Sequence, residues 1–271
     1  MPFTEFNNKK IFYRLAGKGS PVILVHGFAE DGRVWNSQIE AIKDSHLVVI
    51  PDLPGSGSSE MLDGKASIEQ YAEVIKALAD LVIGKNGNRS DNRFSLIGHS
   101  MGGYITLAFA EKYPELLKSF GLFHSSGYAD SEEKAATRKK AIEFISRNGT
   151  EAFLKTSVPN LFAEPAKKEK PELIAQLMDI ASAISPEVLI QYYEAMLARP
   201  DRTEVLKTFT NPVLIIAGKF DAAVPLPASL EQFCMPTVAM VHILQHSGHM
   251  GMWEEPNLSN LFLSDFLRAS G

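Results

Sequence analysis

Ser100 occupies the position in this chain that is best suited to nucleophilic chemistry. The apolar run 94–97 ends at Gly98, and Ser100 is followed by Gly102 and an apolar, helix-forming run. A serine on such a strand-to-helix turn takes a strained backbone conformation, which proteins usually tolerate only for function. Gly98 and Gly102 would let the strand and the helix approach, because a Cβ at either position would collide with neighbouring backbone. The N–H groups of the helix N-terminus would then face any group bound to the serine.

A serine hydroxyl becomes a nucleophile when a base lies within hydrogen-bond reach and an acid orients that base. His249 lies between the last predicted strand, 238–244, and the last predicted helix, and we predict that it is the base. His246 in the same loop is the alternative base. Asp221 follows the predicted strand 213–217 and is the predicted acid. The chain order serine, aspartate, histidine is expected of a hydrolase whose nucleophile sits on a strand–turn–helix unit.

Acyl transfer also needs hydrogen-bond donors for the oxyanion of the transition state. We predict that these donors are the backbone N–H groups of Met101, just after the serine, and of Phe28, in the loop after an early strand. His26 is expected to orient that loop. The sequence contains no cluster of metal ligands and no complete dinucleotide-binding motif, so we predict neither a metal nor an organic cofactor.

Alternating strands and helices predict the scaffold that positions these residues. Apolar, β-branched runs alternate with helical patterns up to residue 126 and again from residue 212. This alternation predicts an α/β fold with a mostly parallel, doubly wound sheet of about eight strands. The stretch between is helical in pattern. We therefore predict a core of residues 1–126 and 206–271 and an all-helical cap of residues 127–205, above the strand ends where open α/β sheets bind ligands.

Two local expectations complete this outline. Asp130 with Glu133 is predicted to open a cap helix that ends at Gly149. The polar stretch 85–92 is predicted to be a loop between a helix and the strand that leads to Ser100.

Composition excludes several classes of partner. The chain has 271 residues and a formal net charge of −5, so it lacks a basic footprint for nucleic acid or an anionic membrane surface. No apolar run reaches the roughly 18 residues that a membrane-spanning helix needs. The N-terminus lacks the hydrophobic region of a secretory signal, and the single cysteine, Cys234, agrees with a reducing compartment. We expect a cytoplasmic protein without nucleic-acid or membrane partners, and leave its oligomeric state open.

Five segments of the chain together resemble the α/β-hydrolase fold superfamily. They lie on both sides of the predicted cap and read HGF (26–28), DLPGSGSS (52–59), GHSMGG (98–103), GKFDAAVP (218–225) and SGHMGMWEEP (247–256). The resemblance implies the same roles for Ser100, Asp221, His249, Phe28 and Met101, and residues 127–205 resemble the four-helix cap common in this superfamily. A serine at position 100 argues against dehalogenase and epoxide hydrolase relatives, which carry an aspartate there.

These residues predict a carboxylesterase-like serine hydrolase that cleaves an ester of a small, largely apolar substrate through an acyl-enzyme intermediate. Hydrolysis of a lactone, a thioester or a carbon–carbon bond, and perhydrolysis, are alternatives that use the same triad. A non-catalytic receptor for a small ligand is a further alternative on the same fold. The expected substrate pocket is lined by His124, Leu161, Phe162, Tyr192, Val224, Met250 and Trp253.

Overall fold

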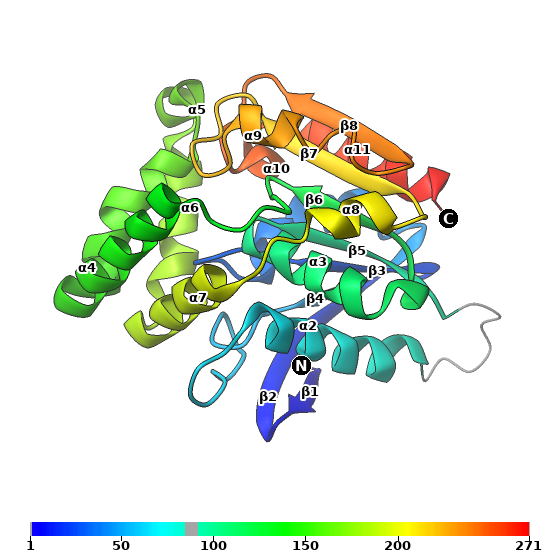
Figure 1. Ribbon diagram of the computed structural model, residues 1–271, viewed down its shortest axis with the longest axis horizontal. Coiled ribbons are helices and arrows are strands. Elements are labelled where there is room, and N and C mark those ends of the chain that lie inside the picture. The colour runs from blue at the N-terminus through cyan, green and yellow to red at the C-terminus, as the bar shows by residue number, and fades with distance from the viewer. Residues whose placement is uncertain (1, 85–91, 271) are drawn as a thin grey trace.

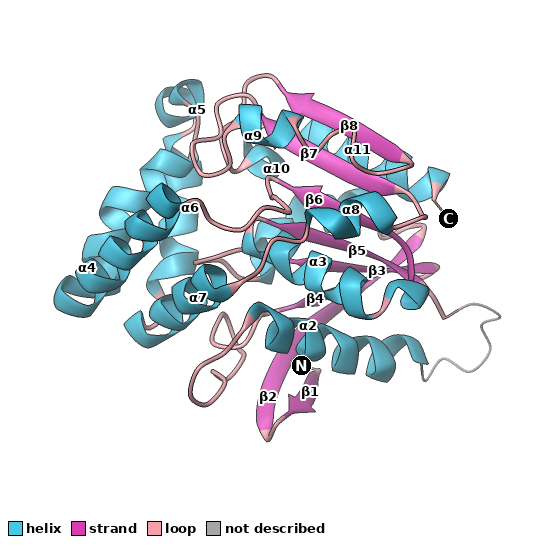
Figure 2. Ribbon diagram, viewed as in Figure 1, coloured by secondary structure: helices cyan, strands magenta, loops and turns pink. Residues whose placement is uncertain are grey.

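An eight-stranded sheet forms the centre of the computed structural model, which describes residues 2–84 and 92–270 (Figures 1 and 2). The strands lie in the order β1-β2-β4-β3-β5-β6-β7-β8. The pairs β1–β2 and β2–β4 are antiparallel, and the other neighbouring pairs are parallel. This architecture confirms the predicted α/β class and the mostly parallel sheet. The strand bounds are Phe3–Phe6 (β1), Lys9–Ala16 (β2), Ser20–Val25 (β3), His46–Pro51 (β4), Phe94–His99 (β5), Leu117–Phe123 (β6), Val213–Gly218 (β7) and Ala239–Leu244 (β8).

The central strands are apolar because both of their faces are covered. Every residue of β5 and β7 is buried, as is every residue of β3 after Ser20. Strands buried on both faces need apolar side chains on both, so their sequences show continuous runs instead of alternation. β8 lies at the edge of the sheet and is partly exposed along most of its length. The predicted loop 85–92 lies, apart from Asn92, outside the described residues.

Helices cover both faces of the sheet (Figure 1). α2 packs against α3 in front of the sheet, and α1 packs against α11. α2 begins with a reciprocal cap in which Ser67 and Gln70 exchange side-chain-to-backbone hydrogen bonds. The bounds of the core helices and short helical turns are Gly32–Trp35 (η1), Asn36–Ile42 (α1), Ile68–Ala79 (α2), Asp80–Gly84 (η2), Met101–Lys112 (α3), Pro114–Leu116 (η3), Leu226–Leu230 (α9), Gly251–Glu254 (α10) and Pro256–Ala269 (α11).

Most of the chain between β6 and β7, from α4 to α7, forms a group of helices at one end of the sheet (Figure 1, left). At Gly149 the backbone φ is 78°, so α4 consists of two helical segments that meet where the sequence predicts a helix end. α8 (Thr203–Thr208) packs on α3, so the predicted boundary at residue 205 falls inside α8. Within the described ranges no single helix could span a membrane, and only α6 and α7 together, bent by 98°, have the length and composition. The helices before α8 are Glu132–Ser157 (α4), Val158–Leu161 (η4), Glu164–Glu169 (α5), Pro171–Ser182 (α6) and Pro186–Ala198 (α7).

The prediction that Asp130 caps α4 is wrong. Ser131 is the N-cap residue, and its hydroxyl accepts the N–H of Lys134 at 3.2 Å. The Asp130 carboxylate instead accepts hydrogen bonds from Arg138 at 2.6 Å and from Arg199 at 2.9 Å. Burial alone would raise the pKa of Asp130, but the two guanidinium groups outweigh burial and hold it below its ordinary value. Asp130 therefore joins the start of α4 to the residue that ends α7.

Candidate active site

Ser100 stands at a sharp turn between β5 and α3, with φ 51° and ψ −116°. Its N–H donates to the carbonyl of Phe123 at 2.9 Å, and its own carbonyl accepts the Ser125 hydroxyl at 2.7 Å. A Cβ at Gly98 would collide with the backbone of Gly102, and one at Gly102 would collide with the backbone at the end of β3. Both glycines are therefore required by close backbone contact, as the sequence predicts.

Asp221 and His249 lie in the loops that follow β7 and β8, and their side chains meet. His249 Nδ1 lies 2.8 Å from Asp221 Oδ2. Asp221 Oδ1 accepts the backbone N–H groups of Ala223 at 2.9 Å and Val224 at 2.8 Å. Burial would raise the pKa of Asp221, but the charge of His249 and hydrogen bonds from His249 and His124 outweigh burial and hold it well below its ordinary value. Asp221 is therefore an ionised acceptor that fixes the His249 ring.

Among the described residues, the hydroxyl of Ser100 has no hydrogen-bond partner. The side chain of His99, which precedes Ser100, lies with Nε2 2.9 Å from the carbonyl oxygen of His249 and so links the serine turn to the loop of His249. The rings of His99 and His249 have their centroids 4.9 Å apart. The hydrogen bond between Ser100 and His249 that a triad needs stays a prediction.

The predicted oxyanion donors lie beside Ser100. A Cβ built on Gly27 would come within 3.0 Å of Ser100 Cβ, so the loop that carries Phe28 lies against the serine. Among the described residues, no hydrogen bond to a protein acceptor uses the N–H of Phe28 or of Met101. The residue after Phe28, Ala29, has a φ of 58°, which turns the loop at this point. Their role as oxyanion donors stays a prediction.

Backbone strain gathers at this site. Five residues other than glycine have positive φ in the described chain; Asn7 and Asn8 form the turn between β1 and β2. Asparagine adopts this conformation readily, which accounts for that pair. The other three are Ala29, Ser100 and His124, with φ between 50° and 58°. Strain of this kind persists where the surrounding structure enforces it, commonly at functional sites.

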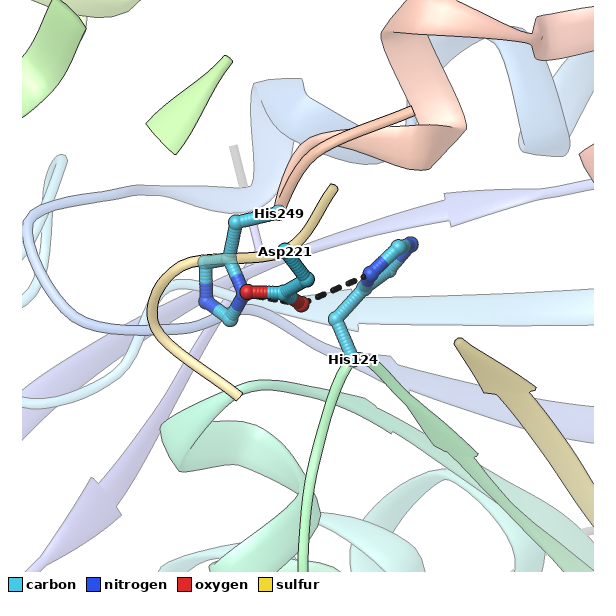
Figure 3. A group of neighbouring side chains, drawn as sticks. All are labelled: His124, Asp221 and His249. Carbon is cyan, nitrogen blue, oxygen red and sulfur yellow. Dashed lines mark hydrogen bonds and ion pairs between the residues drawn. The ribbon is translucent and has the colours of Figure 1, made fainter. Parts of the chain in front are cut away.

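His124 is a second histidine on the same carboxylate oxygen (Figure 3). Its Nδ1 lies 3.1 Å from Asp221 Oδ2, opposite the bond from His249. Burial lowers the pKa of His124 to about 4, so the ring is neutral, and its buried Nε2 has no partner among the described residues. These contacts make His124 an additional hydrogen-bond donor to Asp221. Its role in lining the substrate pocket stays a prediction.

His124, Asp221 and His249 also have the donor types of a small metal site. One ligand atom from each lies within 4.8 Å of the others. Both Nδ1 atoms face Asp221 Oδ2 at hydrogen-bond distance, and a ring nitrogen that donates its N–H has no lone pair for a metal. A metal would therefore have to displace the hydrogen bonds that orient His249.

Replacing His124 by asparagine is expected to change how stability depends on pH. The pKa of His124 is about 4 in the folded chain against an ordinary 6.5, so the unfolded chain binds more protons between these values. The free energy of unfolding of wild type therefore falls as the pH falls through this window. Asparagine does not titrate, so the variant lacks this dependence. Asparagine also accepts the positive φ of position 124. The stability of wild type relative to His124→Asn should decrease by about 3 kcal/mol from about pH 7 to about pH 4 in urea unfolding. A difference that is independent of pH would contradict a neutral His124.

A profile of the alpha/beta hydrolase family matches residues 22–258. The chain belongs to the alpha/beta hydrolase family. The match includes the serine turn, the helices between β6 and β7, and the loops that carry Asp221 and His249. The resemblance noted from the sequence is thereby confirmed, and so is the assignment of the protein as a hydrolase enzyme.

Individual relatives of this alpha/beta hydrolase differ in activity. It is 28% identical over 95% of its length to the dihydrolipoyllysine-residue acetyltransferase component of an acetoin cleaving system from Pseudomonas putida, of which it spans 66%. It is 25% identical to a 2-hydroxy-6-oxononadienedioate/2-hydroxy-6-oxononatrienedioate hydrolase from Pseudomonas sp, over 96% of this chain and 92% of that one. A thermophilic esterase from Thermogutta terrifontis, with malate bound, superposes with a TM-score of 0.90 and 28% identity, over 99% of this chain and 97% of that chain.

Glu254 ties the His249 loop of this hydrolase to the cap. One carboxylate oxygen accepts the N–H groups of Gly248 at 2.9 Å and Met250 at 3.2 Å, and the other accepts the N–H of Ala163 at 2.8 Å. The N–H of His249 itself donates to the carbonyl of Leu161 at 2.7 Å. Burial raises the pKa of Glu254 to about 7, although these N–H donors favour the ionised form. The loop that carries His249, which we call the base loop, is therefore held by Glu254 on both sides of His249 and by the cap backbone at His249 itself.

Replacing Glu254 by glutamine is expected to weaken activity in a pH-dependent way. A glutamine amide has one carbonyl oxygen, so it can accept either the N–H groups of Gly248 and Met250 or the N–H of Ala163, but not both sets. A protonated Glu254 is restricted in the same way. Because the pKa of Glu254 is about 7, wild type resembles the variant below that pH and differs from it above. The ratio of wild-type to variant kcat/KM should rise from near one at about pH 6 to about tenfold at about pH 8.5, the effect of one lost charge-assisted bond. A constant ratio would contradict this role.

The other predicted pocket residues have mixed surroundings. The hydroxyl of Tyr192 contacts the carbonyl of Pro54 and the hydroxyl of Ser56, both at 2.8 Å, and Trp253 Nε1 donates to the carbonyl of Val34 at 2.8 Å. These hydrogen bonds hold the two side chains in place, and a pocket role for them stays a prediction. The same is true of the others: Leu161 and Val224 contact the His249 and Asp221 loops through backbone atoms, and Phe162 and Met250 are buried.

Two aromatic residues of the cap, Phe153 and Tyr193, pack against Phe28, and the sequence does not predict this contact. We call the loop that carries Gly27 and Phe28 the oxyanion loop. The Phe28 ring packs against Tyr193 at a centroid distance of 4.3 Å and against Phe153 at 6.2 Å. Phe153 comes from α4 and Tyr193 from α7, so two cap helices meet above Phe28. Their aromatic character is visible in the sequence, but nothing there indicates which turn of each helix faces the core.

Proposed function

We propose that this alpha/beta hydrolase cleaves a carboxylic ester of a small, largely apolar substrate through an acyl-enzyme intermediate. The observation that carries the proposal is the 2.8 Å bond between His249 and an ionised, buried Asp221, beside a serine held at a φ of 51°. A base and its orienting acid next to a strained hydroxyl are the parts that acyl transfer needs.

The reaction proceeds in two halves. Ser100 Oγ attacks the ester carbonyl while His249 Nε2 accepts its proton, and Asp221 stabilises the imidazolium that forms. The N–H groups of Phe28 and Met101 donate to the oxyanion, which is the largest single contribution expected of the site. His249 then returns its proton to the leaving alcohol. A water activated by His249 attacks the acyl-enzyme, and the carboxylic acid leaves as Ser100 regains its proton.

The surroundings of Phe28 support an apolar acyl group. The aromatic rings of Tyr193 and Phe153 cover the loop that supplies one oxyanion donor. The esterase from Thermogutta terrifontis, at 28% identity and a TM-score of 0.90, supports ester hydrolysis over the alternatives. The carbon–carbon bond alternative is supported by the oxo-acid hydrolase from Pseudomonas sp at 25% identity. A panel of aryl esters, lactones, thioesters and oxo-acids ranks these activities by kcat/KM.

A fluorophosphonate probe tests the proposal directly, because it reacts with a serine that a base has activated. We expect stoichiometric labelling at Ser100, located by peptide mass spectrometry, and loss of labelling after prior treatment with an ester inhibitor. A folded protein that binds small esters without labelling would favour the receptor alternative instead.

A further inference from the structure

Glu30 and His99 form a second carboxylate–histidine pair that the proposed mechanism does not use. His99 Nδ1 lies 3.0 Å from both carboxylate oxygens of Glu30. The two side chains are 2% and 0% exposed respectively, so the pair is fully enclosed. Burying two ionisable groups costs several kcal/mol unless they are paired and hydrogen-bonded. The close pairing of Glu30 and His99 therefore offsets the cost of burying both groups.

Hydrogen-bond chemistry determines where the protons lie. His99 Nε2 lies 2.9 Å from the carbonyl oxygen of His249, and a carbonyl can only accept, so Nε2 carries a hydrogen. Glu30 Oε2 already accepts the N–H of Gly27 at 2.7 Å, as an ionised carboxylate does. Burial opposes charge on both groups, but mutual attraction and hydrogen bonding outweigh it, lowering the pKa of Glu30 and raising that of His99. Nδ1 then carries a hydrogen as well, and His99 is an imidazolium.

The pair contacts all three loops of the candidate site. Glu30 holds the oxyanion loop through Gly27, His99 belongs to the turn that carries Ser100, and its Nε2–H holds the base loop at His249. The ring of His99 is tilted 48° to that of His249, with centroids 4.9 Å apart.

We propose that Glu30 and His99 form a permanent ion pair that positions two loops against Ser100: the loop that carries Gly27 and Phe28, and the loop that carries His249. The inference rests on the proposed function in assigning His249 as the base. Glu30 and His99 are positioning residues, because they act through backbone groups.

Three other ionisable side chains, Asp221, His124 and His26, lie around the pair of Glu30 and His99. Asp221, in the loop after β7, faces His99, and its negative charge favours a proton on that ring. His124, after β6, has its ring centroid 5.9 Å from that of His99 and is neutral, with a pKa of about 4. His26 faces Glu30 from the loop after β3. Among the described carboxylates, Glu30 alone contacts the His99 ring, so its charge is the one to remove.

Replacing Glu30 by glutamine removes the charge and keeps the hydrogen bonds. The amide oxygen can accept the N–H of Gly27, and the amide NH₂ can donate to Nδ1 of a neutral His99 that keeps its Nε2–H. Ring ¹⁵N NMR should show two N–H groups on His99 in wild type and one in Glu30→Gln. In the variant kcat for an aryl ester should fall about tenfold with KM little changed, because the two loops are then held by neutral hydrogen bonds alone.

A second variant and a control separate charge from packing. His99→Gln keeps a donor near the carbonyl of His249 without a ring charge, and should lower kcat in the same manner. Asp130→Asn removes a buried carboxylate that lies between Arg138 and Arg199 in the cap, and should leave kcat and the two N–H groups of His99 unchanged.

A single N–H on His99 in wild type would overturn the ion pair. Two N–H groups on His99 in wild type, with an unchanged kcat in Glu30→Gln, would overturn the positioning role. The NMR readouts do not depend on turnover, so they also distinguish this proposal from the proposed function: a protein with the predicted spectra that hydrolyses no ester contradicts the function and supports the pair.

Discussion

Ser100→Ala is expected to lower kcat/KM for short-chain aryl esters by at least about 10⁴-fold. The hydroxyl is the only atom lost, and without it no acyl-enzyme forms, so the residual rate comes from bound water and the oxyanion donors. The fold should persist, because the Ser100 hydroxyl has no hydrogen-bond partner among the described residues. Steady-state hydrolysis with a fluorophosphonate titration of active sites measures the effect.

Ser125→Ala is the matched control. Its hydroxyl lies beside the same turn and donates to the carbonyl of Ser100 at 2.7 Å, but it is not the proposed nucleophile. Loss of one such bond should change kcat/KM by less than about tenfold. If Ser100→Ala kept wild-type rates, or if both variants lost activity equally, the nucleophile would have to be sought elsewhere.

Asp221→Asn is expected to lower kcat by about 10⁴-fold, the loss typical of a misoriented triad histidine. The carboxylate accepts four hydrogen bonds, from His249 and His124 on one oxygen and from Ala223 and Val224 on the other. In either orientation of the asparagine amide, its NH₂ group faces one of these two pairs of donors. At least that pair therefore loses its acceptor. Stability should also fall by about 2 kcal/mol for the unsatisfied buried groups. Stopped-flow acylation rates and urea unfolding measure the two effects.

Asp52→Asn serves as the control for this substitution. Asp52 is also buried, and its two oxygens accept the N–H groups of Gly32 at 2.9 Å and Ser58 at 3.0 Å. Its replacement should lower stability in the same manner while kcat changes little. A fully active Asp221→Asn would exclude Asp221 as the orienting acid.

Local sequence and chain order predict the parts of this site that depend on a single loop. Gly98 and Gly102 are explained by close backbone contact at one turn, and Asp221 and His249 each follow a predicted strand, β7 and β8. Parallel strands end at the same edge of a sheet, so loops far apart in the chain are brought together once the strand order is known. The contact between Asp221 and His249 could therefore be anticipated, while the catalytic role of the triad stays a prediction.

Residues whose role depends on partners in other elements could not be anticipated. Glu30 is 69 positions from His99, and Glu254 is 91 positions from Ala163. Asp130 has the local pattern of a helix cap, but Arg199 at the end of α7 offers a charged partner that the pattern does not reveal. His124 follows a strand, and only the tertiary structure places its Nδ1 against Asp221.

The attachment of the His249 loop to cap backbone limits how this enzyme can be re-engineered. Transplanting a foreign cap to alter substrate range would remove the carbonyl of Leu161 and the N–H of Ala163, to which His249 and Glu254 bind. A chimaera of that kind would inherit a new binding surface together with a loosened imidazole. Grafts that retain residues 158–164, and exchange only the helices beyond them, should preserve turnover.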